Sequence, residues 1–200
     1  MADWPEVAEV VKRLRRVRTA NAIPSDARGK GLFRSYVGSY PAYLRYFQDR
    51  SPITPDDLII GAGLVYGWMP RALTIEPALL EESTLLLDQA RRRMLKPAEL
   101  TQLAKAMGNS LVGASKLLHF VAPAKYPIWD SRVCRFLLGT AYQGLLQDPE
   151  IYLRYAGLCQ SIVAAPDFPA LAKVAESMCQ YPVDPFRAVE LLMFVAGAKV

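Results

Sequence analysis

The fold is decided by residues 97–139, which read PAELTQLAKAMGNSLVGASKLLHFVAPAKYPIWDSRVCRFLLG. Apolar residues recur there at spacings of three and four, which predicts helices over 97–107 and 111–121 on either side of a short turn. A third helix is predicted over 131–138, and Asp130 stands immediately before it as a suitable cap. The segment therefore predicts two helices joined by a turn, followed by a loop that brings one carboxylate to the start of another helix.

A turn of this kind has a function that follows from backbone chemistry. Two helices joined by a short glycine-containing turn point consecutive N–H groups, and the positive end of the second helix, at one phosphate. DNA is held in this way without any reading of its base sequence. The residues expected to contact DNA are Gly108, Asn109, Ser110, Gly113, Lys116 and Arg132. For Lys116 and Arg132, pairing with acids such as Glu99 is the alternative.

Helical periodicity extends over almost the whole chain, and strand signals are nearly absent. A first helix is indicated by Val7, Val10, Val11, Leu14 and Val17, and a helical stripe by Tyr36, Tyr40, Tyr43 and Phe47, for which core packing is favoured over base stacking. The other predicted helices run from a Thr54 cap to about Trp68, where Met69-Pro70 ends the helix, and over 77–94, 148–164, 169–180 and 184–197. The expected fold is all-α with about ten helices, as one domain over residues 1–200 or as two lobes that share a core.

The net charge of +5 is gathered in two basic runs. The first run comprises Lys12, Arg13, Arg15, Arg16 and Arg18, and the second comprises Arg91, Arg92, Arg93 and Lys96. Such runs suit a polyanion, because neutralised phosphates release condensed counterions. A solvated helix face is the alternative for each run.

Other classes of protein are disfavoured by composition. The three cysteines have no zinc-binding spacing and are expected to be buried and reduced, so we expect no metal and no cofactor. The longest apolar stretch, residues 58–70, is shorter than the about 20 residues of a membrane span. The start of the chain lacks an export signal. We therefore expect a cytoplasmic monomer that does not insert into membranes.

The segment 97–139 resembles the helix-hairpin-helix DNA glycosylases, the family of endonuclease III and the adenine and 8-oxoguanine glycosylases. That family carries a hairpin of the type Leu-Pro-Gly-Val-Gly-x-Lys-Thr-Ala and then the motif Val-Asp-Thr-His-Val-x-Arg. When Ala114 is aligned with the last alanine of the hairpin, Asp130 falls on the catalytic aspartate without a gap, and Arg135 matches the final arginine. The resemblance covers about forty residues and implies a helical glycosylase-like fold with a central helix-hairpin-helix.

Departures from the family pattern refine what the resemblance implies. Met107 replaces the hairpin proline and Ser110 replaces the second glycine, while Gly108 is kept. Val112 stands where some members carry the lysine that attacks the sugar carbon. The implied enzyme is therefore monofunctional and leaves an abasic site, unless Lys116, one helical turn further on, replaces that lysine. The cysteine ligands of the iron–sulfur cluster found in part of the family are also missing.

Asp130 is the implied catalytic carboxylate. Breaking an N-glycosidic bond develops positive charge on the sugar, and a nearby carboxylate stabilises that charge and aligns the attacking water. The alternative interpretation is that Asp130 is only a helix cap. A glycosylase also extrudes the target base into a pocket with aromatic walls. The candidate pocket residues are Tyr66, Trp68, His119 and Trp129.

Two other functions stay open at this point. A helix-hairpin-helix module that binds DNA without catalysis would bind regardless of Asp130. An interaction protein of another class, such as an all-helical toxin or scaffold, would show no salt-dependent affinity for DNA. The identity of the base, and a role in repair or in defence against modified phage DNA, do not follow from the sequence.

Overall fold

The computed structural model describes residues 4–18, 27–69 and 72–198, and within these ranges it contains eleven α-helices, one 3-10 helix and no strand. The expected all-α fold of about ten helices is thus confirmed. In chain order the elements are α1 (Val7–Leu14), α3 (Ala27–Gln48), α4 (Pro55–Trp68), η1 (Pro77–Leu79), α5 (Leu80–Arg92), α6 (Pro97–Ala106), α7 (Leu111–Val121), α8 (Ser131–Leu138), α9 (Gln143–Leu146), α10 (Pro149–Val163), α11 (Phe168–Cys179) and α12 (Pro185–Ala196).

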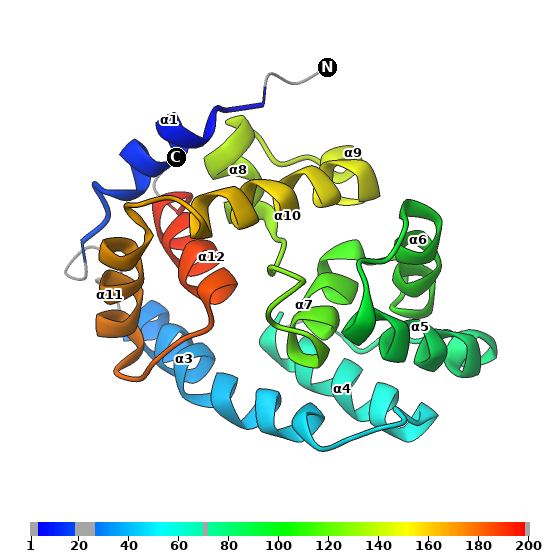
Figure 1. Ribbon diagram of the computed structural model, residues 1–200. Helices are drawn as coiled ribbons and strands as arrows, with labels where there is room; N and C mark the ends of the chain where they lie inside the picture. The colour runs from blue at the N-terminus through cyan, green and yellow to red at the C-terminus, as the bar shows by residue number, and fades with distance from the viewer. Residues whose placement is uncertain (1–3, 19–26, 70–71, 199–200) are drawn as a thin grey trace.

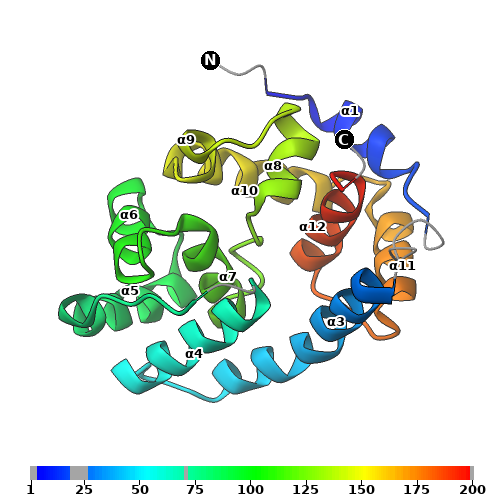
Figure 2. The same cartoon turned by 180° about the vertical axis from the view of Figure 1, so that it is seen from behind.

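The helices form two groups, which Figures 1 and 2 show from opposite sides. Helices α4 to α7 lie together on one side, and α1 with α8 to α12 lie on the other. The long helix α3 runs from the second group to the first, and the loop from α7 to α8 crosses back. One cluster of buried apolar side chains extends through both groups, so hydrophobic burial holds them together. The segment singled out by the sequence, from α6 to α8, joins the two groups.

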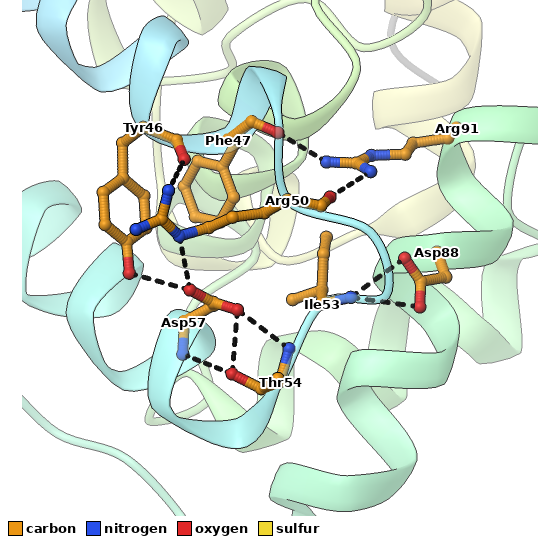
Figure 3. A network of polar contacts seen from close by, with 8 residues as sticks. All are labelled: Tyr46, Phe47, Arg50, Ile53, Thr54, Asp57, Asp88 and Arg91. Atoms are coloured by element: carbon orange, nitrogen blue, oxygen red, sulfur yellow. Dashed lines mark hydrogen bonds and ion pairs between the residues drawn. The ribbon is translucent and has the colours of Figure 1, made fainter.

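The corner between α3 and α4 is closed by a polar network centred on Asp57 (Figure 3). Thr54 caps α4 by accepting the Asp57 amide at 3.2 Å, and the Asp57 carboxylate accepts the Thr54 amide in return at 3.1 Å. Arg50 and Tyr46 donate to the same carboxylate at 2.6 and 3.0 Å. Burial alone would raise the pKa of Asp57, but these hydrogen bonds lower it to about 2. The network fixes the angle at which α4 leaves α3.

Several arginines of the two basic runs serve the fold. Arg91 donates to the carbonyls of Phe47 and Arg50 at this corner (Figure 3). Arg93 pairs with Glu99 across the start of α6, with N–O distances of 2.7 and 2.8 Å. In the first run Arg13 donates to a carbonyl of α8 and Arg15 pairs with an acid that precedes α11. Neither expectation for these runs, a phosphate-binding patch or a solvated face, describes these four arginines.

The predicted helix limits agree closely with those observed, and α7 and α8 have the expected limits. Three details differ. The first helix ends at Leu14, although Val17 is buried beyond it, and α9 was not predicted. The predicted stop at Pro70 lies outside the described residues. In the described part of the chain, no helix combines the length and apolar character that crossing a bilayer requires.

Candidate functional site

The turn between α6 and α7 is built from two consecutive left-handed residues. Gly108 has a φ of 63° and Asn109 a φ of 58°, and the Ser110 amide donates back to the Ala104 carbonyl at 3.0 Å. Glycine adopts this conformation at little cost, and asparagine adopts it more readily than most residues. The turn therefore reverses the chain even though Met107 and Ser110 depart from the family pattern.

The amides at the start of α7 already have acceptors within the protein. Ser110 caps the helix, with its Oγ accepting the Gly113 amide at 3.0 Å. The Leu111 amide donates to Oε1 of Gln147, which lies just after α9, at 2.7 Å. A phosphate at this turn therefore has to replace Gln147, or to use the Val112 amide and exposed side chains such as Asn109.

Tyr66 anchors the turn from α4. Its hydroxyl donates to the Met107 carbonyl at 2.7 Å, and the side chain is buried. A Cβ on Gly108 would lie 3.0 Å from this hydroxyl and 2.8 Å from Cβ of Thr74. Tyr66 thus has a structural partner, and its role in a base pocket stays a prediction.

Replacing Gly108 by alanine is expected to destabilise the protein by about 1–2 kcal/mol or more. The left-handed conformation accounts for roughly this cost, and the close approach of Thr74 adds to it. Gly63→Ala is the matched control, because Gly63 is an exposed position inside α4 with no atom near a new Cβ. Urea unfolding of the three proteins measures the difference. Equal stabilities of the two variants would contradict the structure of the turn.

The loop from α7 to α8 is held at four successive carbonyls by buried side chains. His119 Nδ1 bonds to the carbonyl of Tyr126 at 2.7 Å, and Tyr152 donates to that of Pro127 at 3.2 Å. Tyr155 donates to the carbonyl of residue 128 at 3.0 Å. Ser115 Oγ bonds to both the carbonyl and the amide of residue 129, at 3.3 and 3.1 Å. The position of Asp130, the next residue, is therefore set by side chains of α7 and α10.

Asp130 caps α8 with a single oxygen. Its Oδ1 accepts the amides of Arg132 and Val133 at 2.9 and 3.0 Å. No described residue donates to Oδ2, and the side chain is only half-buried. The capping role and the catalytic role therefore do not compete for the same atom, because one oxygen fixes the carboxylate and the other faces away from the cap.

Trp129 points in the opposite direction, into the core. The side chain is fully buried, and its ring lies 5.0 Å from that of Tyr155 between ring centroids. Its indole Nε1 has no hydrogen-bond acceptor among the described residues. In this arrangement the ring lies behind the loop and not beside Asp130, and its part in a base pocket stays a prediction.

The structure brings the two other pocket candidates together at Tyr40, a residue of α3. The Tyr40 ring stacks on that of Trp68 at 6.1 Å with an angle of 17°, and the Tyr40 hydroxyl lies 2.7 Å from His119 Nε2. Trp68 Nε1 donates to Ser39 at 2.8 Å. Further rings complete what is here called the aromatic cluster, which consists of Tyr36, Tyr40, Tyr43, Trp68 and Phe120.

His119 is a neutral residue inside the protein. Burial lowers its pKa to about 3, and the nearby charge of Arg187 also lowers it. Because a carbonyl can only accept, the bond to Tyr126 assigns the ring proton to Nδ1, and Nε2 then accepts from the Tyr40 hydroxyl. His119 therefore connects the aromatic cluster to the loop that carries Asp130.

A buried ion pair on α12, which the sequence did not single out, lies between the aromatic cluster and Asp130. Arg187 pairs with Glu190, and the two side chains are 5% and 1% exposed. Burial raises the pKa of Glu190 to about 7 against the attraction of Arg187, and the charge of Asp130 raises it as well. Lys116 acts in the opposite direction on Glu190. These four charged groups therefore interact electrostatically.

The residues expected to bind DNA are unequally placed. Asn109 and Arg132 are exposed, and the Arg132 guanidinium lies 4.4 Å over the Phe194 ring. Gly108 and Ser110 are half-buried, and Gly113 is buried. Lys116 is 7% exposed, so in this structure its ammonium group is not presented to a phosphate outside the protein.

The chemistry of the site rests on organic side chains. Within the described ranges, no three histidine, cysteine or acidic side chains converge as metal ligands do. All three cysteines are buried and unpaired, and the expectation that they are buried is confirmed. Comparison of the chain with family models, curated proteins and solved structures finds no match. The fold and site therefore define an all-helical protein with a helical hairpin beside a fixed carboxylate.

Proposed function

We propose that this protein is a monofunctional DNA glycosylase with Asp130 as its catalytic carboxylate. The observation that carries the proposal is the placement of Asp130. It follows a loop held at four carbonyls, it begins α8, and its Oδ2 accepts no hydrogen bond from a described residue. Such a fixed and partly exposed carboxylate is suited to a transition state that develops positive charge.

The reaction needs one water and no cofactor. As the bond between the base and the sugar C1′ breaks, the electron pair leaves with the base and positive charge develops on the sugar. Oδ2 of Asp130 stabilises this charge and accepts a proton from the water that attacks C1′. The leaving base takes up a proton in exchange. The products are a free base and an abasic site in an otherwise intact strand.

Strand cleavage through a covalent intermediate finds little support at this site. Val112 lacks a nucleophile, and the alternative nucleophile Lys116 is buried beside the Glu190 charge. A lysine attacks a sugar carbon only as a neutral amine that reaches it. We therefore expect abasic sites that break only after treatment with alkali.

DNA affinity is expected to depend on Arg132, which lies in the first turn of α8 next to the catalytic acid. Replacing Arg132 by alanine should weaken DNA binding on all sequences alike and reduce the slope of log affinity against log salt by about one unit. Arg154→Ala is a matched control, since Arg154 is also exposed and lies 5.1 Å over the Trp4 ring. Titration of labelled duplex DNA at several salt concentrations measures both. An unchanged slope in the Arg132 variant would contradict this contact.

The experiment that tests the function is base release. Genomic DNA, phage DNA with modified bases, and duplexes with single lesions are incubated with the protein, and abasic sites are scored by alkali cleavage. Appearance of abasic sites identifies both the activity and the substrate. DNA binding without release from any substrate would favour a non-catalytic DNA-binding module, for which the helix cap formed by Asp130 is a sufficient role.

A further inference from the structure

The aromatic cluster contains a positive charge at its centre. The guanidinium carbon of Arg187 lies 5.0 Å from the centroid of the Tyr40 ring and 5.4 Å from that of Trp68. The same side chain is ion-paired with Glu190. Since the two rings are nearly parallel, one cation interacts with both of them. The electron-rich faces that would attract a second cation are therefore already used.

Arg187 also has an unused hydrogen-bond donor. Its Nε is buried and has no acceptor among the described residues. A buried donor without a partner is costly, and an arginine offers several donors in a planar fork. The vacancy can be filled by an acceptor, such as a carbonyl oxygen or an unprotonated ring nitrogen, on a molecule that enters the cluster. It cannot be filled by another donor.

The position of Arg187 relative to Asp130 suits a role in recognising the base. Glu190, the partner of Arg187, interacts with the charge of Asp130, and Arg187 influences the pKa of His119 on the hairpin helix. A nucleotide with its sugar at Asp130 would therefore extend its base toward the aromatic cluster. The ring of Trp68, a predicted pocket residue, lies next to the guanidinium.

We propose that Arg187 restricts the substrate to uncharged bases with a keto edge and excludes the cationic bases produced by alkylation. This inference rests on the proposed glycosylase function. A keto edge offers acceptors that match an arginine fork, as in the pairing of arginine with the O6 and N7 atoms of guanine. A cationic base lacks an attraction to the occupied ring faces and is repelled by the guanidinium, which lies in an interior of low dielectric constant.

The test compares release of two kinds of base by the wild-type protein. Uracil, 5-hydroxymethyluracil, hypoxanthine and 8-oxoguanine in duplex DNA represent neutral keto bases. Methylated DNA that contains 7-methylguanine and 3-methyladenine represents the cationic bases, with spontaneous release subtracted. We expect at least one neutral keto base to be released about 100-fold more efficiently, in kcat/KM, than either cationic base.

Two variants assign this selectivity to the guanidinium. The double variant Arg187→Gln with Glu190→Gln removes both charges together, so that no unpaired charge is left in the core. It is expected to lower the ratio of neutral to cationic release by about tenfold or more. Arg187→Lys keeps the positive charge and is expected to keep the exclusion of cationic bases. Circular dichroism and thermal unfolding show which variants are folded.

The outcomes separate the inference from the function on which it rests. Wild-type protein that releases cationic bases as efficiently as neutral ones would overturn the inference and leave the glycosylase function intact. A folded double variant with unchanged selectivity would also overturn it. No release of any base from any DNA would refute the proposed function itself. If the double variant does not fold, the selectivity of the wild-type protein and of Arg187→Lys still decides the question.

Discussion

Replacing Asp130 by asparagine is expected to lower base release by about 10²- to 10⁴-fold and to leave stability nearly unchanged. The loss follows because asparagine neither stabilises positive charge on the sugar nor takes a proton from water. Stability is kept because asparagine caps helices as well as aspartate does, and its side-chain oxygen can accept the amides of Arg132 and Val133. Alkali-scored release under single-turnover conditions and urea unfolding measure the two quantities.

The chain offers a matched control for this substitution. Asp148 caps α10 in the same way, with Oδ1 accepting the amides of Glu150 and Ile151 at 2.8 and 3.3 Å. Asp148→Asn therefore repeats the same change at a helix start that the reaction does not use, and it should release base at the wild-type rate. Equal activity of the Asp130 and Asp148 variants would restrict Asp130 to its structural role.

Replacing Arg187 by methionine is expected to destabilise the fold by about 3–5 kcal/mol near neutral pH. The substitution leaves Glu190, which is 1% exposed, without its counter-charge in the core. The double variant Arg187→Met with Glu190→Leu removes both charges and should regain most of the lost stability. Urea unfolding of the wild-type protein and the three variants gives the coupling between the two side chains. A double variant as unstable as Arg187→Met alone would contradict this account.

The loss should also depend on pH in a definite direction. Burial holds the pKa of Glu190 in the folded protein at about 7, above its ordinary value of 4.5. The folded state therefore keeps this proton more tightly than the unfolded state, and stability falls as pH rises from 4.5 through 7. Arg187 lowers this pKa, so its removal raises the pKa further and increases the penalty of ionisation. The destabilisation by Arg187→Met is therefore expected to be larger near pH 8 than near pH 5.

The helices were predictable because apolar spacing, proline at helix starts and capping residues agree along most of this chain. Thr54 before Pro55 starts α4 with a complete capping box, and Asp148 before Pro149 starts α10. The one helix that was missed, α9, has only four residues and includes Gly144. A helix that short shows no periodicity from which it can be predicted.

The candidate site was only partly predictable, because tertiary contacts decide which polar residues meet. Asp130 was found from its spacing to the hairpin. Arg187 and Glu190 were missed, because they lie in a helix that otherwise has the apolar pattern of a core element. Tyr152 and Tyr155 were missed as well, although two tyrosines three residues apart on a buried helix face usually need partners for their hydroxyl groups.

The four held carbonyls of residues 126–129 make the length of the α7–α8 connection a fixed quantity. Each carbonyl matches one side chain, so inserting or deleting a single residue would shift all four pairs at once. Most surface loops tolerate such length changes at a small entropic cost. Evolution can therefore vary the hairpin sequence and the pocket of this protein far more easily than it can vary the number of residues that separate the hairpin from its carboxylate.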